Sequence, residues 1–527
     1  MNLKFKTNSA FPKYEIISQL ILITFLIIYG LIFINYHFIA VTNPFPLQGD
    51  EGHTIVISNI MLQGGNPYDI INQPASTNMY GIVYFIIAYP FAELFGLSFL
   101  ILRLLSASFI FLTCYLIFKI LRQKGVSIAF SFAAMLILYA HFLGSTEYLA
   151  RPDSLGVFLF LLSIYLPWKN KYSPRSICFG IIFGILAFYT KPYFILSIPY
   201  ILSYTFIFIS KKKALISGVI AFFLFLISIV IVNFLFECYL SNTIFVNFHN
   251  ASHRIDYAIS QIKAYIIINK WLFVILFIQI CFLIITIFEK RKNIYSKLKS
   301  MDLISRKINI TKLNKPLFTA NVDIFLFSLC CSVIMFLISL GQHDGSWLNY
   351  AFQTISPFFV IVLFDNNKIE KIAILKFIAC ILIIVHLLIF SERIKLYGHN
   401  YLNEWGKINS LLLKYNNIYN STFISALIVE QGKKVYDDGH TAYFHFGTTH
   451  NVFPQIDKLI LNRHNEYLHF VNNSIMNKKF DLVVTYIIGP AYVDKDILKK
   501  YYKILTILPA PIPYYSQMWE LEFWVPI

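Results

Sequence analysis

Two acidic segments of the sequence carry the residue types best suited to acid–base chemistry. Asp50 and Glu51 are adjacent in the segment GDEGH (49–53), which precedes a helix-like run over 54–62. Asp153 opens a later apolar run. A carboxylate can take a proton from a hydroxyl group, and a nearby Arg, Lys or divalent metal ion can stabilise a departing phosphate. The simpler alternative is that Asp50 and Asp153 only cap the helices that follow them.

Cations and histidines near the same predicted membrane face complete a candidate anion-handling site. Arg151, Lys191 and Arg254 stand beside apolar runs, where they can bind phosphate or place their charge at the membrane interface. His249 and His253 are four residues apart, a spacing that could hold a metal ion on one helix face. Loop histidines are more often bystanders. The candidate metal ligands are Glu51, Asp153, His249 and His253.

The composition is that of a membrane protein with many spans. Of the 527 residues, 57% are hydrophobic and 13% are charged, whereas a soluble domain is about 25% charged. The formal net charge is +17, but the cations cluster in short loops between apolar runs, and the polar tail is nearly balanced. This distribution argues against a nucleic-acid partner. The seven cysteines lie in or beside apolar runs, so no disulfide framework is expected.

Eleven apolar runs are predicted to cross the membrane. The run over 80–96 is excluded because a spanning helix needs about 20 apolar residues, so we expect a juxtamembrane or re-entrant helix there. With that assignment every basic cluster lies on one side, which the positive-inside rule identifies as the cytoplasm. The predicted spans are 16–40, 97–121, 126–143, 154–168, 176–189, 193–210, 214–236, 265–288, 320–340, 352–364 and 372–390.

Two domains follow from this topology. Residues 1–390 form a transmembrane domain, in which 41–96 is an extracytoplasmic loop with juxtamembrane helices. Residues 391–527 form an extracytoplasmic α/β domain, and the N-terminus is cytoplasmic. Strands are expected at 423–429, 481–487 and 502–508, with turns at 437–439 and 509–511. We expect a bacterial plasma membrane, although the endoplasmic reticulum would obey the same charge rule.

Four segments in order resemble the GT-C superfamily of polytopic glycosyltransferases. The resemblance is closest to its family 39 type, which includes protein O-mannosyltransferases and lipid A aminoarabinose transferases, and it covers residues 10–195. The segments are GDEGH (49–53) with MLQGGNPY (61–68), LFG (94–96) with RLLS (103–106), YLARPD (148–153) and YTKP (189–192). The sequence departs from the family where STNMYG (76–81) replaces a Glu-Lys-Pro-Pro-like element, and where Pro192 replaces the usual Gly.

The resemblance implies an inverting transferase that takes a hexose or pentose from a polyprenyl-phosphate donor at the outer membrane face. Asp50 matches the catalytic Asp, which would take the proton of an acceptor hydroxyl on a glycan, a lipid or a protein. Membrane lipids surround the protein, and a divalent metal ion is an open option. The residues that would bind substrate are Glu51, Arg151, Asp153, Lys191 and Arg254. Arg103 is expected to form a structural ion pair, with Glu93 as a possible partner.

A transporter or flippase of envelope glycolipid precursors is the alternative function, followed by a non-catalytic scaffold. Transporters tend to have repeated halves with broken helices near the membrane midplane. The sequence has no such internal repeat, and its charges gather at one predicted surface. These two features favour the transferase.

Overall fold

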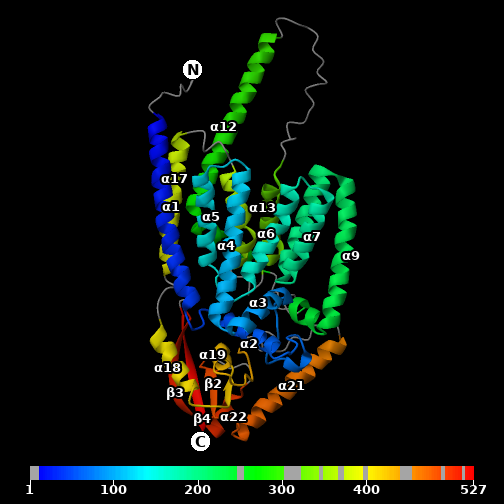
Figure 1. Cartoon of the computed structure of the whole chain (residues 1–527), viewed down its shortest axis with the longest axis vertical. Helices are drawn as coiled ribbons and strands as arrows, with labels where there is room; N and C mark the ends of the chain where they lie inside the picture. The colour runs from blue at the N-terminus through cyan, green and yellow to red at the C-terminus, as the bar shows by residue number, and fades with distance from the viewer. Residues whose placement is uncertain are drawn as a thin grey trace.

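The computed structural model is a helical bundle with a small sheet domain at one end (Figure 1). The structure describes residues 11–245, 254–301, 322–342, 348–365, 373–395, 401–439, 454–487, 493–512 and 517–527. In Figure 1 the bundle occupies the upper part and the sheet domain the lower part. The end of the bundle next to the sheet domain carries the helix α2 (Gly49–Leu62), which contains Asp50.

Serine caps and proline define where several helices of the bundle begin. The Ser98 side chain accepts a hydrogen bond from the backbone N–H of Ile101 at the start of α4, and Ser173 caps α7, whose first residue is Pro174. The helices of the bundle are α1 (Phe11–Thr42), α4 (Phe99–Gln123), α5 (Ile128–Leu143), α6 (Asp153–Lys169), α7 (Pro174–Phe188), α8 (Ser197–Tyr204), α9 (Lys211–Leu235), α11 (Ile255–Ile268), α12 (Lys270–Met301), α13 (Ile324–Met335), α14 (Asn349–Thr354), α15 (Ser356–Phe364) and α17 (Ala373–Lys395).

All eleven predicted spans fall on helical segments of the bundle. Among the described helices, five are long and apolar enough to cross a membrane, and a sixth arises if α11 and α12, which meet at 84°, form one bent span. Several other predicted spans are shorter helices. The number that cross the bilayer therefore stays a prediction.

The outer helices of the bundle expose apolar side chains, as expected for contact with lipid. Leu31 and Phe38 of α1 are 64% and 65% exposed, and Phe234 of α9 is 87% exposed. A surface this apolar is incompatible with water over its whole length and fits the hydrocarbon of a bilayer. The inner faces of the helices share one continuous apolar core.

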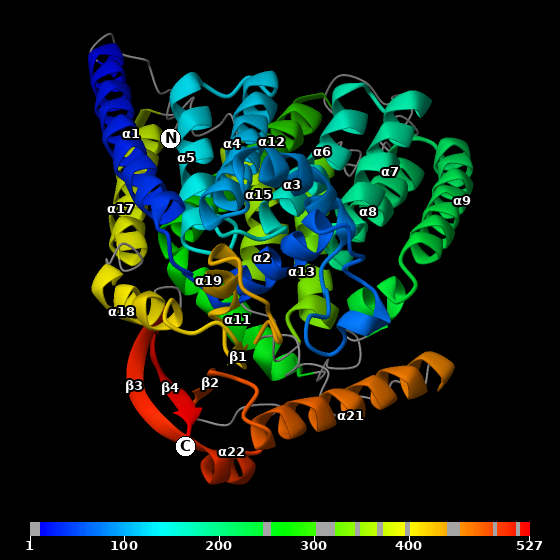
Figure 2. The ribbon, with the colours of Figure 1, turned by 60° about the horizontal axis from the view of Figure 1, so that its bottom comes forward.

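Two short helices lie between the bundle and the sheet domain in Figure 1, and Figure 2 brings this end of the molecule forward. They are α2 (Gly49–Leu62) and α3 (Ile82–Phe95), which pack against each other. The run over 80–96 is thus a helix of 14 residues, too short to span a bilayer on its own. It ends at Gly96, whose φ of +84° is a backbone conformation that glycine adopts without strain. Leu94 and Phe95 at this end are largely exposed.

A mixed four-stranded sheet organises the C-terminal part of the chain. The strand order is β1-β2-β4-β3, with β1 parallel to β2 and the other two pairs antiparallel. Apolar clusters lie on both faces of the sheet. The elements are β1 (Ile418–Asn420), β2 (Leu482–Tyr486), β3 (Tyr502–Ile512), β4 (Gln517–Pro526), α18 (Leu402–Leu412), α19 (Ser425–Glu430), α21 (Pro454–Met476) and α22 (Lys495–Tyr501).

Two local predictions for the C-terminal part are wrong. The strand expected over 423–429 is instead helix α19, which packs on α2. The turn expected at 509–511 lies inside β3. Pro509 and Pro511 are tolerated within β3 because it is an edge strand. At such a strand the backbone N–H that proline lacks need not bond to a neighbouring strand.

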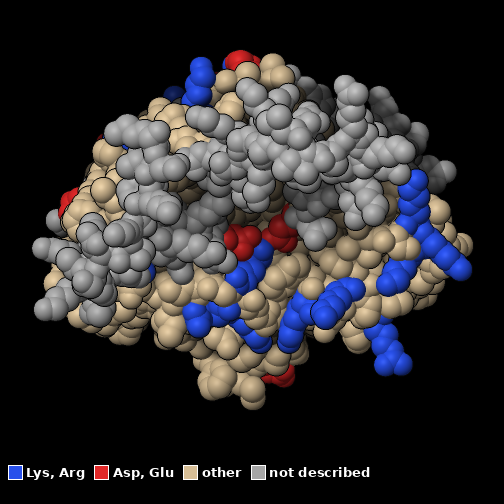
Figure 3. Space-filling model, turned by 90° about the horizontal axis from the view of Figure 1, so that it is seen from above, with Lys and Arg blue, Asp and Glu red and all other residues tan. Residues whose placement is uncertain are grey.

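Lys and Arg gather on the face of the bundle opposite the sheet domain (Figure 3). Figure 3 looks down on this face and shows blue side chains across its described part. The exposed cations at this end are Arg122, Lys169, Lys171, Arg175, Lys211, Lys212 and Lys213. The two ends of the bundle therefore differ in charge, as the predicted topology requires.

Candidate active site

Helix α2 brings the first acidic segment to the end of the bundle next to the sheet domain. Its N-cap is Gln48, whose side-chain oxygen accepts a hydrogen bond of 2.9 Å from the Asp50 backbone N–H. The interpretation of Asp50 as the N-cap is therefore wrong. Because the Gln48 side chain accepts from the backbone N–H of Asp50, the Asp50 carboxylate is available for contacts outside its own helix. Its position in the first turn still places it in the favourable field of the helix dipole.

Asp50, Arg151, Asp153 and Lys191 form one cluster of alternating charge. Arg151 donates from its Nη1 to the Asp50 carboxylate and from its Nε to Asp153 at 3.1 Å. Lys191 Nζ lies 2.7 Å from the other oxygen of Asp153. The four side chains come from α2, the loop before α6, the first residue of α6 and the segment between α7 and α8. Two carboxylates thus face two cations, all of them at least 88% buried.

Tyr80 covers both cations of this cluster. Its ring centroid lies 5.6 Å from Arg151 Cζ and 5.2 Å from Lys191 Nζ, within the range of a cation–π contact. Burial lowers the pKa of Lys191, and the Asp153 carboxylate opposes that effect. An anion that entered the cluster would find two cations already stripped of most of their water, which strengthens its attraction to them.

Asp153 is also held by neutral donors that the sequence analysis did not select. Gln353 of α14 donates from its Nε2 at 2.6 Å, and the Thr146 hydroxyl lies at 3.3 Å. Tyr193 in turn donates to the Gln353 carbonyl oxygen. A polar pair such as Gln353-Thr354 inside a predicted span is the one sequence signal that could have found this group.

Glu147 is a further buried carboxyl group next to this cluster. Its side chain is fully buried and neither oxygen forms a hydrogen bond of normal geometry. Burial, followed by the charge of Asp153, raises its pKa from the usual 4.5 to about 8. Glu147 is therefore mainly neutral at pH 7 and adds little negative charge to the site.

The contacts of Glu51 do not match the substrate-binding or metal-ligand role that the sequence predicts for it. Its Oε1 accepts from Arg103 Nε and the Ala150 N–H, and its Oε2 from Arg103 Nη2 and the Leu47 N–H, each at 2.8 Å. Both side chains of the ion pair are fully buried. With four donors on its two oxygens, Glu51 has no lone pair left for a ligand.

Arg103 completes this structural unit. It donates further bonds to the backbone oxygens of Ala40, Asn43 and Phe45, so the ion pair ties the end of α1 and the following loop to α2 and α4. The structural ion pair expected for Arg103 exists, but its partner is Glu51 and not Glu93.

Arg254, the remaining predicted site residue that the structure describes, does not join the charge cluster. Arg254 is 55% exposed and pairs with Asp256, itself 69% exposed, at the start of α11. His249 and His253 lie outside the described residues. Among the residues that the structure does describe, no group of three His, Cys, Asp or Glu side chains is placed to hold a metal ion. Asp153, the other proposed ligand, is occupied by four protein donors.

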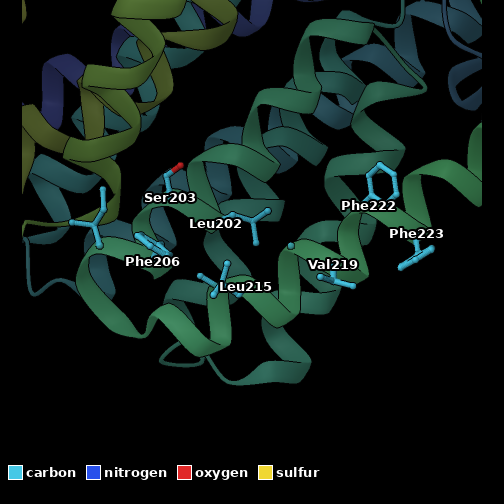
Figure 4. Close-up of a pocket in the computed structure, with 10 residues that line it drawn as sticks. Leu202, Ser203, Phe206, Leu215, Val219, Phe222 and Phe223 are labelled. Carbon is cyan, nitrogen blue, oxygen red and sulfur yellow. The ribbon is translucent and has the colours of Figure 1, made fainter.

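An apolar groove of about 580 Å³ lies elsewhere on the bundle (Figure 4). Its lining comes from α8, the following turn and α9, and includes Leu202, Phe206 and Phe222. No ionisable side chain lines it, so it offers nothing for acid–base or phosphate chemistry. The charge cluster, not this groove, is the candidate active site.

The same architecture is found in crystal structures of ArnT from Cupriavidus metallidurans. With the undecaprenyl phosphate-bound structure the TM-score is 0.53 at 10% identity, over 95% of this chain and 97% of that one. With the apo structure the TM-score is 0.57 at 10% identity, over 94% and 97%. The chain has the fold of ArnT. No family model and no curated protein matches the sequence.

The ArnT fold confirms the resemblance drawn from the four sequence segments, and with it the prediction of a polytopic helical membrane protein. Near-complete coverage of both chains means that the match includes the C-terminal part as well as the bundle. At 10% identity the likeness concerns the fold alone, so the roles of single side chains must be argued from the charge cluster itself.

Proposed function

We propose that this protein is a glycosyltransferase that moves a sugar from a polyprenyl-phosphate donor to an acceptor hydroxyl, with inversion and with Asp50 as the general base. The observation that carries this proposal is the buried cluster in which Asp50 and Asp153 share Arg151 while Lys191 stands beside them. The ArnT structure with bound undecaprenyl phosphate adds support for a polyprenyl-phosphate donor.

Donor binding would release Asp50 for catalysis. While Arg151 is paired with Asp50, that carboxylate is a poor proton acceptor, because the guanidinium stabilises its ionised form. A donor phosphate competes for Arg151 and Lys191, since Arg binds phosphate with two parallel hydrogen bonds. The ion pair between Asp50 and Arg151 then breaks as the donor arrives. The same exchange leaves Asp153 with Gln353 and Thr146, which keep it in place.

The transfer step follows from these roles. The acceptor oxygen attacks the anomeric carbon and forms a new C–O bond, while its proton passes to Asp50. The bond between the anomeric carbon and the phosphate oxygen breaks, and the electron pair leaves with the polyprenyl phosphate. Arg151 and Lys191 stabilise the charge that develops on this leaving group. Attack from the face opposite the leaving group inverts the configuration.

The distribution of charge supports an orientation with this site outside. The cation-rich end of the bundle would face the cytoplasm, and the charge cluster and the C-terminal α/β domain the exterior. A bacterial plasma membrane fits such a donor, and the acceptor would be a hydroxyl-bearing glycan, lipid or protein. Arg254, at the same end of the bundle, would contact substrate only by moving toward the cluster.

Replacement of Asp50 by Asn tests the mechanism. Purified full-length protein is given a panel of undecaprenyl-phosphate-linked hexoses and pentoses with an envelope extract as acceptor, and transferred sugar is measured by mass spectrometry. We expect Asp50→Asn to lower kcat on the order of 10²–10⁴-fold, the range attributed to a general base. Asp69→Asn, in the same loop, is the control and should retain wild-type kcat. Full transfer by Asp50→Asn would exclude this mechanism.

The same preparation distinguishes the transporter alternative. In sealed vesicles, a flippase would move a labelled lipid-linked sugar between leaflets without breaking its bond to phosphate. Movement of intact donor with no product from any sugar of the panel would favour the transporter over the transferase.

A further inference from the structure

His53 connects the helix of the proposed catalytic base to the C-terminal part of the chain. It lies on α2, three residues after Asp50, and its Nδ1–H donates to Asp438 Oδ2 at 2.7 Å. Both side chains are fully buried. The His53 ring also packs on Tyr80, at 5.7 Å between centroids, the same ring that covers Arg151 and Lys191. His53 therefore contacts both Asp438 and Tyr80, the ring that packs on the two cations of the charge cluster.

The Asp438 loop is fixed firmly enough to act as an anchor. The Asp438 backbone N–H donates to the Ala75 carbonyl at 2.8 Å, and its own carbonyl accepts from Ser425 Oγ at 3.0 Å. The next residue, Gly439, has φ +74°, and a Cβ there would lie 1.6 Å from the Thr422 carbonyl oxygen. Only glycine allows this close approach. The loop is thus bound both to the segment before α3 and to the residues that lead into α19.

Helix α2 is in direct contact with the same C-terminal residues. A Cβ on Gly52 would lie 2.9 Å from the Phe423 carbonyl oxygen and 2.9 Å from Ser425 Oγ. The α2 backbone at Gly52 is therefore in close contact with the Phe423 backbone and the Ser425 hydroxyl. In an α-helix, residues three apart differ by about 60° in direction around the axis. Fixing the direction of His53 consequently fixes the direction of Asp50.

We propose that Asp438 is a positioning residue of the transfer reaction, which acts through His53 to set the rotation of α2 and so to aim Asp50 at the phosphate and acceptor sites. This inference rests on the proposed function, because it assigns the C-terminal part of the chain a share in the same active site. Asp438 acts on Asp50 through His53 and α2. Its effect is carried by one buried charge-assisted hydrogen bond.

Asp437 supplies a matched control in the same loop. It is also fully buried next to Asp438, but its carboxyl group faces Tyr419 and Tyr467, whose hydroxyls lie 3.3 and 3.1 Å from its Oδ2. Burial, and then the charge of Asp438, raise the pKa of Asp437. Asp437→Asn keeps the size of the side chain and an oxygen that can accept from the two tyrosine hydroxyls.

Kinetics on the full-length protein test the positioning role. Asp438→Ala should lower kcat on the order of 10- to 100-fold, because a displacement of about 1 Å at a reacting group can cost 10²-fold. The KM for the undecaprenyl-phosphate-linked donor should change little, since Arg151 and Lys191 are untouched. Asp438→Asn keeps an oxygen that accepts from His53 and should recover part of kcat. Asp437→Asn should match the wild type, and a kcat loss equal to that of Asp438→Asn would contradict the proposal.

Hydrogen–deuterium exchange provides a readout that does not depend on transfer. Asp438→Ala should raise deuterium uptake across residues 49–62, and Asp437→Asn should not. Wild-type kcat together with wild-type uptake in Asp438→Ala would overturn the positioning role. If the wild-type protein transfers no sugar, the proposed function fails alone, and the uptake of α2 still decides whether Asp438 holds it. Should Asp438→Ala not fold, the comparison of Asp438→Asn with Asp437→Asn decides both readouts.

Discussion

At the scale of single residues, the most informative group is one that carries no charge at neutral pH. Glu147 lies beside Asp153 with neither oxygen hydrogen-bonded in normal geometry, and burial raises its pKa to about 8. An ionised Glu147 would add a third negative charge beside Asp50 and Asp153, and this charge would repel the donor phosphate. Its neutral form thus preserves the balance of two carboxylates and two cations in the charge cluster.

Replacement of Glu147 by Gln should change how stability depends on pH. In the unfolded chain this carboxyl group loses its proton near pH 4.5, whereas in the folded protein it keeps the proton up to about pH 8. The folded state therefore loses stability as the pH rises from 4.5 through 8. Glu147→Gln removes this loss, so its Tm should exceed that of the wild type by several degrees at pH 8 and match it near pH 4.5.

Thermal unfolding followed by differential scanning fluorimetry across this pH range measures the difference. The control is Glu466→Gln, because Glu466 is 62% exposed on α21 and should leave the pH profile unchanged. Parallel Tm curves for Glu147→Gln and the wild type would show that Glu147 titrates like an ordinary surface carboxylate.

The sequence identifies the charged residues of the site but not which of them form ion pairs with one another. Asp50, Arg151, Asp153 and Lys191 belong to three separate segments of the sequence, and the fold brings them together. Glu51 also carries a carboxylate and is adjacent to Asp50 in the sequence, yet it faces Arg103. Which of two adjacent carboxylates faces the cluster depends on the rotation of α2, and α2 contacts residues up to 385 positions away in the sequence.

At the scale of elements, the contact between α2 and the segment 423–425 leaves no room for a side chain at Gly52. We expect Gly52→Ala to destabilise the protein by about 1–3 kcal/mol, the usual cost of overpacking. The Phe423 carbonyl oxygen lies in the short connection between β1 and α19, so it cannot move without shifting these two elements. The variant should also lower kcat, since it pushes α2 away from its anchor.

Gly406→Ala is the matched control for this prediction. Gly406 lies inside α18 with nothing within 4 Å of an added Cβ, so alanine there should be neutral or slightly stabilising. Unfolding temperature and kcat are measured for both variants. A Gly52→Ala protein as stable and active as Gly406→Ala would contradict the close contact between α2 and the segment 423–425.

Helices with a long apolar run could be predicted from the sequence, whereas short helices such as α19 could not. All eleven predicted spans fall on helices, since a run of apolar residues leaves a chain in lipid few other structures. The run FISALIV (423–429) has the composition of a strand but forms helix α19, because its apolar side chains pack on a face of the sheet, and the helix itself contacts α2, instead of extending the sheet. Tertiary contacts of this kind leave no local trace in the sequence.

At the scale of the whole molecule, the two ends of the bundle are chemically distinct. One end exposes a group of cations, and the other carries the buried charge cluster and the sheet domain (Figures 1 and 3). Under the positive-inside rule we propose that the first end faces the cytoplasm. The proposed reaction depends on this difference, because donor, acceptor and Asp50 must all meet on the exterior.

Cysteine labelling tests this orientation directly. In a background without the seven native cysteines, one cysteine is placed at Gln63, the exposed C-cap of α2, or at Asn170, the exposed C-cap of α6 at the cation-rich end. A membrane-impermeant maleimide should label Gln63→Cys in right-side-out vesicles and Asn170→Cys only in inverted or permeabilised ones. Labelling of both positions from one side would mean that the chain crosses the membrane an even number of times between them, contrary to the predicted topology. Labelling of Gln63→Cys only from the cytoplasmic side would place Asp50 where no exterior acceptor could reach it.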